Sequence, residues 1–126
     1  AHNLCSPEPA TAVERALTER LIQIAAEGRK FGMWLFLSTQ RPTKIHPNVL
    51  SQCDNLGLMR VNAPRDLAEL AAVFGFAPEE SIRHAQDFAQ GQALFAGGFV
   101  KQPSFVQMGE RLSEEAGGDV RVPWRD

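Results

Sequence analysis

The sequence has no apolar run long enough to cross a bilayer. Its uninterrupted apolar runs reach five residues, as in residues 33–37, whereas a membrane-spanning helix needs about 18 or more. Apolar residues make up 44% of the chain and charged residues 22%, which excludes disordered, collagen-like and low-complexity chains. A chain of 126 residues suffices for one domain with a hydrophobic core. Because it starts at Ala1 and not at methionine, we expect a fragment or a processed chain.

Cysteine and histidine are scarce. The two cysteines and three histidines are Cys5, Cys53, His2, His46 and His84. A structural zinc site needs about four such ligands at close spacing, and the cysteines form no CxxC pair. We therefore predict no metal site, and we expect two reduced thiols in a cytoplasmic protein.

Basic residues are concentrated in the first half of the chain. Residues 15–65 carry eight basic and three acidic side chains, and residues 66–126 carry five basic and ten acidic ones. The first half is therefore suited to face the phosphates of a nucleotide or of DNA. For Arg15 and Arg20 we favour the simpler interpretation that they are the solvated face of a helix.

Local patterns predict an α/β chain. Thr11 and Glu14 have the spacing of a capping box, and apolar residues at helical spacing follow, up to a left-handed cap at Gly32. The remaining predicted elements are a strand at 33–37, a short helix starting at Pro47, a strand at 56–61, a helix capped by residues 62–64, a third helix near 79–85, and antiparallel strands at 92–96 and 104–108.

The alternation of helices and strands predicts a parallel sheet. Binding sites in such sheets lie at the carboxyl ends of the strands. Gln40 and Arg41 follow the strand predicted at 33–37, and Asn62 follows the strand predicted at 56–61. These three residues are therefore expected at one edge of the sheet.

Several short motifs occur in a characteristic order. They are Ala1-His2-Asn3, EGRKFG at 27–32, STQRP at 38–42, IHPNVLSQC at 45–53 and GQALF at 91–95. In this order they resemble the C-terminal half of the ATPase core of HerA-type DNA translocases, in the HerA–FtsK branch of RecA-like P-loop ATPases. The resemblance covers almost the whole chain.

The resemblance implies that residues 1–118 are the C-terminal portion of a RecA-like ATPase domain and that 119–126 are an extended tail. The sequence contains no GxxxxGK[ST] motif, which in P-loop ATPases holds the phosphates. The acidic residues of the Walker B strand would precede Ala1. We therefore expect ATP and Mg²⁺ to be bound by a longer protein and not tightly by this chain alone.

Two residues are the predicted catalytic groups. ATP hydrolysis needs a group that senses the γ-phosphate or positions the attacking water, and an amide after a buried strand suits this role, so we assign it to Gln40. The resemblance makes Arg29 a candidate arginine finger for a neighbouring subunit, with Arg41 and Arg60 as rivals. The simpler alternatives are that the Gln40 side chain only forms hydrogen bonds with the backbone of its loop and that Arg29 interacts with the helix dipole.

Other residues have weaker assignments. The resemblance suggests that His2 and Asn3 lie at the nucleotide site or couple it to DNA, although a lone histidine is more often structural. Lys30 and Lys44 are candidate DNA contacts or simply solvated lysines. Trp124 lies in the tail. In the family this tail can lie across a neighbouring subunit, and the simpler alternative is a frayed chain end.

The function expected from the resemblance is ATP-driven translocation on double-stranded DNA, in a hexameric ring and with a NurA-type nuclease as a partner. Two alternatives remain open: an inactive interaction module that retains the fold, and an ATPase of conjugation or secretion from the same branch. A P-loop and an Asp-Glu pair upstream in the parent reading frame would distinguish the ATPases from the inactive module.

Overall fold

The computed structural model describes residues 4–110 and 112–113 of the chain. The residues expected to form the tail lie outside these ranges. The helices are α1 (Ala12–Glu27), α2 (Pro47–Leu50), α3 (Pro64–Val73) and α4 (Glu79–Arg83), the 3-10 helices are η1 (Gly28–Phe31), η2 (Pro42–Lys44) and η3 (His84–Asp87), and the strands are β1 (Asn55–Leu58), β2 (Gln92–Gly97) and β3 (Ser104–Gln107). Within these ranges no helix is long and apolar enough to span a membrane.

The three strands form one antiparallel sheet in the order β1-β2-β3. Leu56 of β1 is opposite Ala96 of β2, and Leu94 of β2 is opposite Phe105 of β3. The predicted hairpin at 92–108 is therefore confirmed. The predicted parallel sheet is not formed by the described residues, because β1 pairs with β2 in the antiparallel sense.

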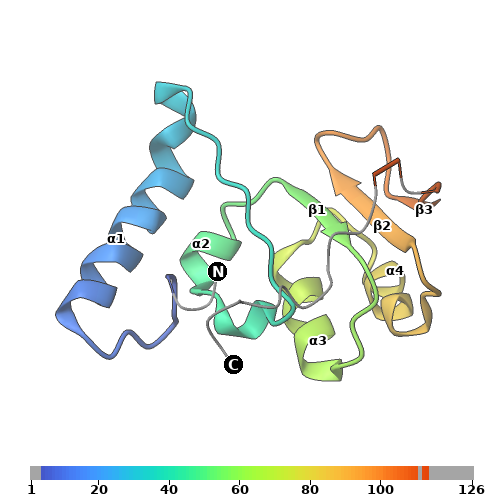
Figure 1. Ribbon diagram of the computed structural model, residues 1–126, viewed down its shortest axis with the longest axis horizontal. Coiled ribbons are helices and arrows are strands. Elements are labelled where there is room, and N and C mark those ends of the chain that lie inside the picture. Colours follow the sequence, from blue (N-terminus) through green and yellow to red (C-terminus); the bar gives the residue numbers. More distant parts are fainter. Residues whose placement is uncertain (1–3, 111, 114–126) are drawn as a thin grey trace, which may run out of the picture.

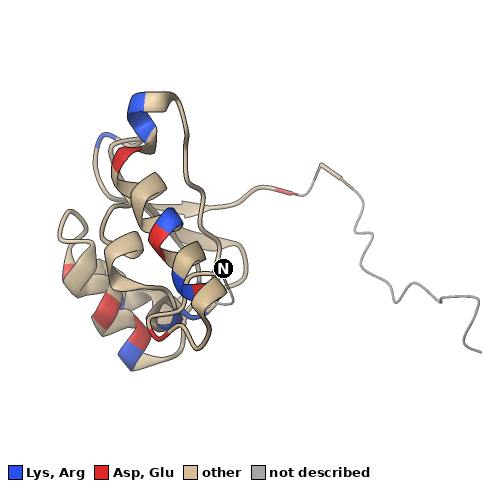
Figure 2. Cartoon of the chain, turned by 90° about the vertical axis from the view of Figure 1, so that its left-hand side faces the viewer, with Lys and Arg blue, Asp and Glu red and all other residues tan. Residues whose placement is uncertain are grey.

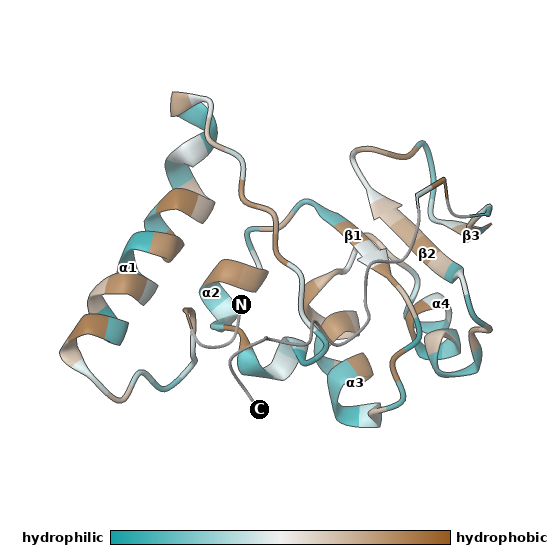
Figure 3. Cartoon of the chain, in the orientation of Figure 1, coloured by the Kyte–Doolittle hydropathy of each residue, from teal (hydrophilic) through white to brown (hydrophobic). Residues whose placement is uncertain are grey.

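Residues 33–37 are the main departure from the predicted secondary structure. They run between η1 and η2 without strand pairing, because no strand of the described chain lies beside them to satisfy their backbone groups. Trp34 is 82% exposed and Phe36 is 90% exposed. Leu35 and Leu37 are half-buried and pack against the core. Figure 3 shows apolar residues along this segment, outside the sheet.

Helix α1 begins as predicted and ends earlier than predicted. Thr11 Oγ1 accepts from the Glu14 N–H, and the Glu14 carboxylate accepts from the Thr11 N–H, so the capping box is confirmed. The helix ends at Glu27, η1 follows, and Gly32 adopts a left-handed conformation with φ 71° after η1. The predicted apolar stripe is only partly covered, since Leu21 packs against the core whereas Val13 is 78% exposed.

The core lies between the short helices and the sheet. Figure 1 shows α3 and α4 beside the sheet and α1 with α2 on the far side of residues 33–37. The buried core side chains include Val49, Leu67, Leu70, Ile82 and Leu94. Each of these residues lies at an apolar position of a short helix or strand, so burial of these positions fixes the arrangement of the elements.

Two predicted elements have different bounds in the structure. The strand predicted at 56–61 ends at Leu58, and the helix predicted near 79–85 is divided into α4 and η3. The N-cap of α3 is Ala63, which makes no side-chain hydrogen bond. Pro64 still starts this helix because its fixed φ suits the first helical position.

Candidate nucleotide and DNA-binding site

Gln40 and Arg41 lie together on an exposed turn between residues 33–37 and η2. The Arg41 N–H donates to Thr39 Oγ1 at 3.0 Å. The carbonyl oxygens of Arg41 and Pro42 accept from the N–H groups of Lys44 and Ile45 at 3.0 and 2.9 Å. The turn is therefore hydrogen-bonded internally while both predicted side chains remain accessible.

A second contact ties this turn to helix α3. Thr43 Oγ1 donates to Asp66 Oδ1 at 2.6 Å, and the Thr43 N–H approaches the same oxygen at 3.4 Å. The contact brings the segment after residues 33–37 beside the segment after β1. The contact therefore attaches η2, which follows the Gln40–Arg41 turn, to the first turn of α3.

Arg29 and Lys30 lie in η1, at the other end of residues 33–37. Both side chains are exposed, and Figure 2 shows basic residues where α1 ends and η1 begins. Residues 33–39 separate η1 from the turn that carries Gln40, and they run without regular secondary structure (Figure 1). Arg29 and Gln40 therefore lie on two different segments.

The remaining predicted residues are divided between the turn and its surroundings. Lys44 ends η2, and Arg60 and Asn62 lie between β1 and α3; all three are exposed. In the part of the chain that the structure describes, an ion pair joins Arg83 to Glu79, and His84 Nδ1 lies 3.6 Å from Asp87 Oδ2. The candidate cations make no ion pair there. His2 and Asn3 lie outside the described residues.

The described residues offer no metal centre. No group of three or more His, Cys, Asp or Glu residues among them is placed to hold an ion. Cys5 and Cys53 are both free thiols. Burial, and then the neighbouring charge of Asp54, raise the pKa of the Cys53 thiol. A raised pKa keeps the thiol protonated and disfavours both metal ligation and nucleophilic chemistry there.

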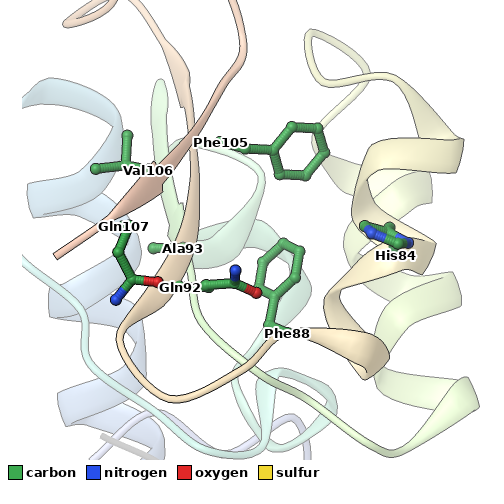
Figure 4. Close-up of a pocket in the computed structure, with 7 residues that line it drawn as sticks. All are labelled: His84, Phe88, Gln92, Ala93, Phe105, Val106 and Gln107. Carbon is green, nitrogen blue, oxygen red and sulfur yellow. The ribbon is translucent and has the colours of Figure 1, made fainter.

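A cavity of about 310 Å³ lies elsewhere, between η3 and the β2–β3 hairpin. Figure 4 shows its aromatic side, formed by His84, Phe88 and Phe105, whose ring centroids are 5.8 to 6.0 Å apart with edge-to-face geometry. None of the predicted site residues lines it. This cavity is therefore separate from the candidate site.

The contact between Thr43 and Asp66 was not predicted from the sequence. Twenty-three positions separate the two residues, and no local pattern links them. The only local signal is the acidic side chain in the first turn of the helix that Pro64 begins, where it stabilises the positive end of the helix dipole.

Comparison with known proteins gives consistent sequence matches. The chain is 30% identical over 100 residues to the probable DNA double-strand break repair helicase HerA of Methanocaldococcus jannaschii, and these residues are 79% of this chain and 20% of that protein. It is 31% identical over 100 residues to the HerA helicase of Sulfurisphaera tokodaii, again over 79% and 20% of the two chains. No family model matches the chain.

A solved structure supports the fold. The genome packaging NTPase B204 of Sulfolobus turreted icosahedral virus 2, solved with AMPPCP, superposes with a TM-score of 0.59 at 18% identity, over 83% of this chain and 49% of that one. At this identity the likeness concerns the fold, which is that of part of a P-loop NTPase.

The chain spans about a fifth of the length of the curated relatives it matches. The matches cover 79% of this chain, so the relationship rests on most of the chain and not on isolated motifs. The chain is therefore a homologue of part of the HerA helicases.

Proposed function

We propose that the chain is the C-terminal part of the ATPase core of a HerA-type translocase on double-stranded DNA. In this proposal Gln40 senses the nucleotide of its own subunit, and Arg29 reaches the nucleotide of the next subunit in a ring. The observation that carries the proposal is the exposed Gln40 turn at the end of residues 33–37, within a chain homologous to HerA helicases.

The exposure of apolar side chains in residues 33–37 supports the proposal that further strands of the sheet come from the preceding part of the protein. Trp34 and Phe36 are 82% and 90% exposed, which is unusual for adjacent large apolar side chains in a finished core. We propose that residues 33–37 become a parallel strand when the preceding part of the protein supplies neighbouring strands.

The chemistry of Gln40 suits a sensor. Its amide can donate to a phosphate oxygen and accept from a water molecule at the same time. A group that orients the attacking water, or that contacts the γ-phosphate, contributes to phosphoryl transfer by positioning. The hydrogen-bonded turn would hold this amide at a fixed place relative to the sheet.

The position of Arg29 suits action on another subunit. Arg29 lies in η1 and Gln40 lies on the turn before η2, so residues 33–39 separate the two groups along the chain. The two groups therefore suit two different nucleotides better than one. A guanidinium supplied by a neighbouring subunit stabilises the charge that develops on the transferred phosphoryl group.

The residues present do not make a complete ATP and Mg²⁺ site. The sequence has no GxxxxGK[ST] motif, and no cluster of three acidic, histidine or cysteine ligands occurs among the described residues. Bound Mg²⁺ would neutralise charge on the phosphates, and its ligands and the phosphate-binding loop would have to come from the preceding part of the protein.

The partners follow from the same proposal. Lys30 and Lys44 are exposed and lie in the basic half of the chain, so they are the proposed contacts with DNA phosphates. A hexameric ring, a NurA-type nuclease partner and a cytoplasmic location complete the proposal. His2 and Asn3 remain candidates for coupling the nucleotide to DNA.

The test is a pair of matched variants in the longer protein. Gln40→Ala should remove most DNA-stimulated ATP hydrolysis while ATP binding persists, because the sensor acts mainly in the transition state. Gln86→Ala, which changes an exposed glutamine of η3, should leave hydrolysis unchanged. Normal hydrolysis by Gln40→Ala would remove the sensor role, and a parent reading frame without an upstream P-loop would favour the inactive interaction module.

A further inference from the structure

We propose that Thr43 and Asp66 are positioning residues, whose hydrogen bond holds the Gln40–Arg41 turn in place against the start of α3. The inference rests on the proposed function of Gln40 and deepens it by naming what fixes its position. Neither residue is expected to touch a nucleotide, since Asp66 is 8% exposed and Thr43 is half-buried.

The contact is a two-point attachment to a single oxygen. Asp66 Oδ1 accepts from the Thr43 hydroxyl at 2.6 Å and lies 3.4 Å from the Thr43 N–H. The short hydroxyl bond to a carboxylate is the stronger of the two, because a charged acceptor roughly doubles the strength of a hydrogen bond. The two donors together fix the direction of the backbone at Thr43 as well as its distance.

The acceptor, Asp66, belongs to helix α3, which is held in place by core packing. Asp66 is the third residue of α3, where the positive end of the helix dipole stabilises a carboxylate. Leu67 and Leu70 of the same helix are 3% and 4% exposed and belong to the core. Movement of the acceptor would therefore disturb core packing, which makes α3 a fixed reference for the turn.

Hydrogen bonds within the turn restrain the residues between Thr43 and Gln40, so that a constraint on Thr43 also limits the position of Gln40. Pro42 is buried beside Thr43, and its carbonyl accepts from the Ile45 N–H. Arg41 is bonded on both sides, through its N–H to Thr39 and through its carbonyl to Lys44. A displacement at Thr43 would thus pass through two residues to Gln40, with few freely rotating bonds between them.

The same contact lies close in sequence to a second set of candidate residues. Arg60 and Asn62 lie in the loop that leads into α3, so the attachment fixes the Gln40–Arg41 turn relative to this loop too. Loss of the Thr43 hydroxyl should therefore reduce the precision of the site without removing any group proposed to contact the nucleotide.

The test uses a substitution of equal shape in the longer protein. Thr43→Val removes the hydroxyl and keeps the branched shape. It should lower kcat roughly 10- to 100-fold, the cost of about 1 Å of misplacement, and should leave KM within about twofold. Thr43→Ser keeps the hydroxyl and should restore most of kcat. A merely structural role would not predict this split between kcat and KM together with rescue by serine.

The matched control is Thr18→Val in α1. Thr18 is also buried, at 4% exposure, and its hydroxyl has no hydrogen-bond partner among the described residues. Thr18→Val should therefore leave kcat at its original value. A fall in kcat for Thr18→Val as large as that for Thr43→Val would overturn the positioning role, because burial of a threonine and not its bond to Asp66 would then be the cause.

Amide hydrogen exchange separates this inference from the proposed function. In Thr43→Val the Lys44 and Ile45 amides should exchange faster than in the original protein, and in Thr18→Val they should not. Unchanged exchange would overturn the attachment itself, and faster exchange with unchanged kcat would overturn its role in positioning. If Gln40→Ala hydrolyses ATP normally, the proposed sensor fails, and the exchange measurement still decides whether the bond holds the turn.

Discussion

Gly97 at the end of β2 lies so close to Asp54 that a Cβ atom on Gly97 would be 2.2 Å from the Asp54 carbonyl oxygen. The backbone at Gly97 also has φ 112°, a conformation that residues with side chains rarely adopt. Nearby, the Gly98 N–H donates to the Asp54 carbonyl at 3.3 Å, and the Phe99 N–H donates to Asn55 Oδ1 at 2.9 Å. The turn after β2 is therefore folded tightly over the start of β1.

This relationship predicts that Gly97→Ala destabilises the chain by at least about 2–3 kcal/mol, since it combines backbone strain with a clash against backbone. Gly98→Ala is the matched control, because its Cβ would meet Asn55 Oδ1 at an ordinary 3.8 Å. Urea unfolding followed by circular dichroism measures both variants. Equal midpoints for the two would show that the turn can open without cost.

A second prediction concerns the reactivity of Cys53. Burial, with the charge of Asp54, raises the pKa of this thiol, so less of the reactive thiolate is present at a given pH. The thiol should therefore react more slowly with a disulfide reagent at pH 8 in the folded chain than in urea. Asp54→Asn removes the repelling charge and should speed the reaction in the folded chain, though not to the rate of the unfolded one.

The sign of the pH effect on stability follows from the same shift. Folding favours the protonated thiol, so this contribution to stability is complete below the pKa of the unfolded thiol. It is lost as the pH rises through the higher pKa of the folded thiol. Cys53→Ser should remove the contribution. An Asp54→Asn variant that reacts no faster than the original chain would contradict a role for the Asp54 charge.

Local sequence signals predicted the elements whose causes are local. The capping box of Thr11 and Glu14, the start of α2 at Pro47 and the antiparallel hairpin all depend on neighbouring residues, and the structure confirms them. The apolar residues 33–37 predicted a buried strand, but a strand also needs partners elsewhere in the chain. No described segment supplies them, so the described residues form an antiparallel sheet and the predicted parallel sheet is not shown.

The candidate site was predictable only in part, because some of its contacts join residues that are far apart in the sequence. Gln40 and Arg41 come two residues after an apolar run, and the structure places them on an exposed turn before η2. The attachment of this turn through Thr43 depends on Asp66, which is 23 positions away. Contacts at such separations are set by the tertiary fold, and no spacing rule in one sequence reveals them.

The isolated 126-residue chain should not hydrolyse ATP. It has no phosphate-binding motif, and the described residues include no group placed to hold Mg²⁺, although phosphoryl transfer depends on both. A phosphate-release assay with Mg²⁺ should match the buffer blank. Metal-dependent release that survives rigorous removal of contaminating ATPases, and that disappears in Gln40→Ala, would show that the chain is active alone.

The last prediction concerns Arg29 in the longer protein. Arg29→Ala should remove most DNA-stimulated ATP hydrolysis, on the order of 10³-fold, while ATP binding survives, because a finger acts mainly on charge in the transition state. The helix end should tolerate the change, since alanine is the best helix former. Lys30→Ala is the matched control for an adjacent exposed cation and should affect DNA binding more than turnover in saturating DNA.

Mixing experiments test whether Arg29 acts on the neighbouring subunit. A subunit with Arg29 but an inactive P-loop should partly restore hydrolysis when mixed with Arg29→Ala, because some interfaces then pair a working finger with a working nucleotide site. Absence of rescue, although mixed rings are shown to form, would contradict action between subunits. Near-normal turnover by Arg29→Ala would instead transfer the finger role to Arg41 or Arg60.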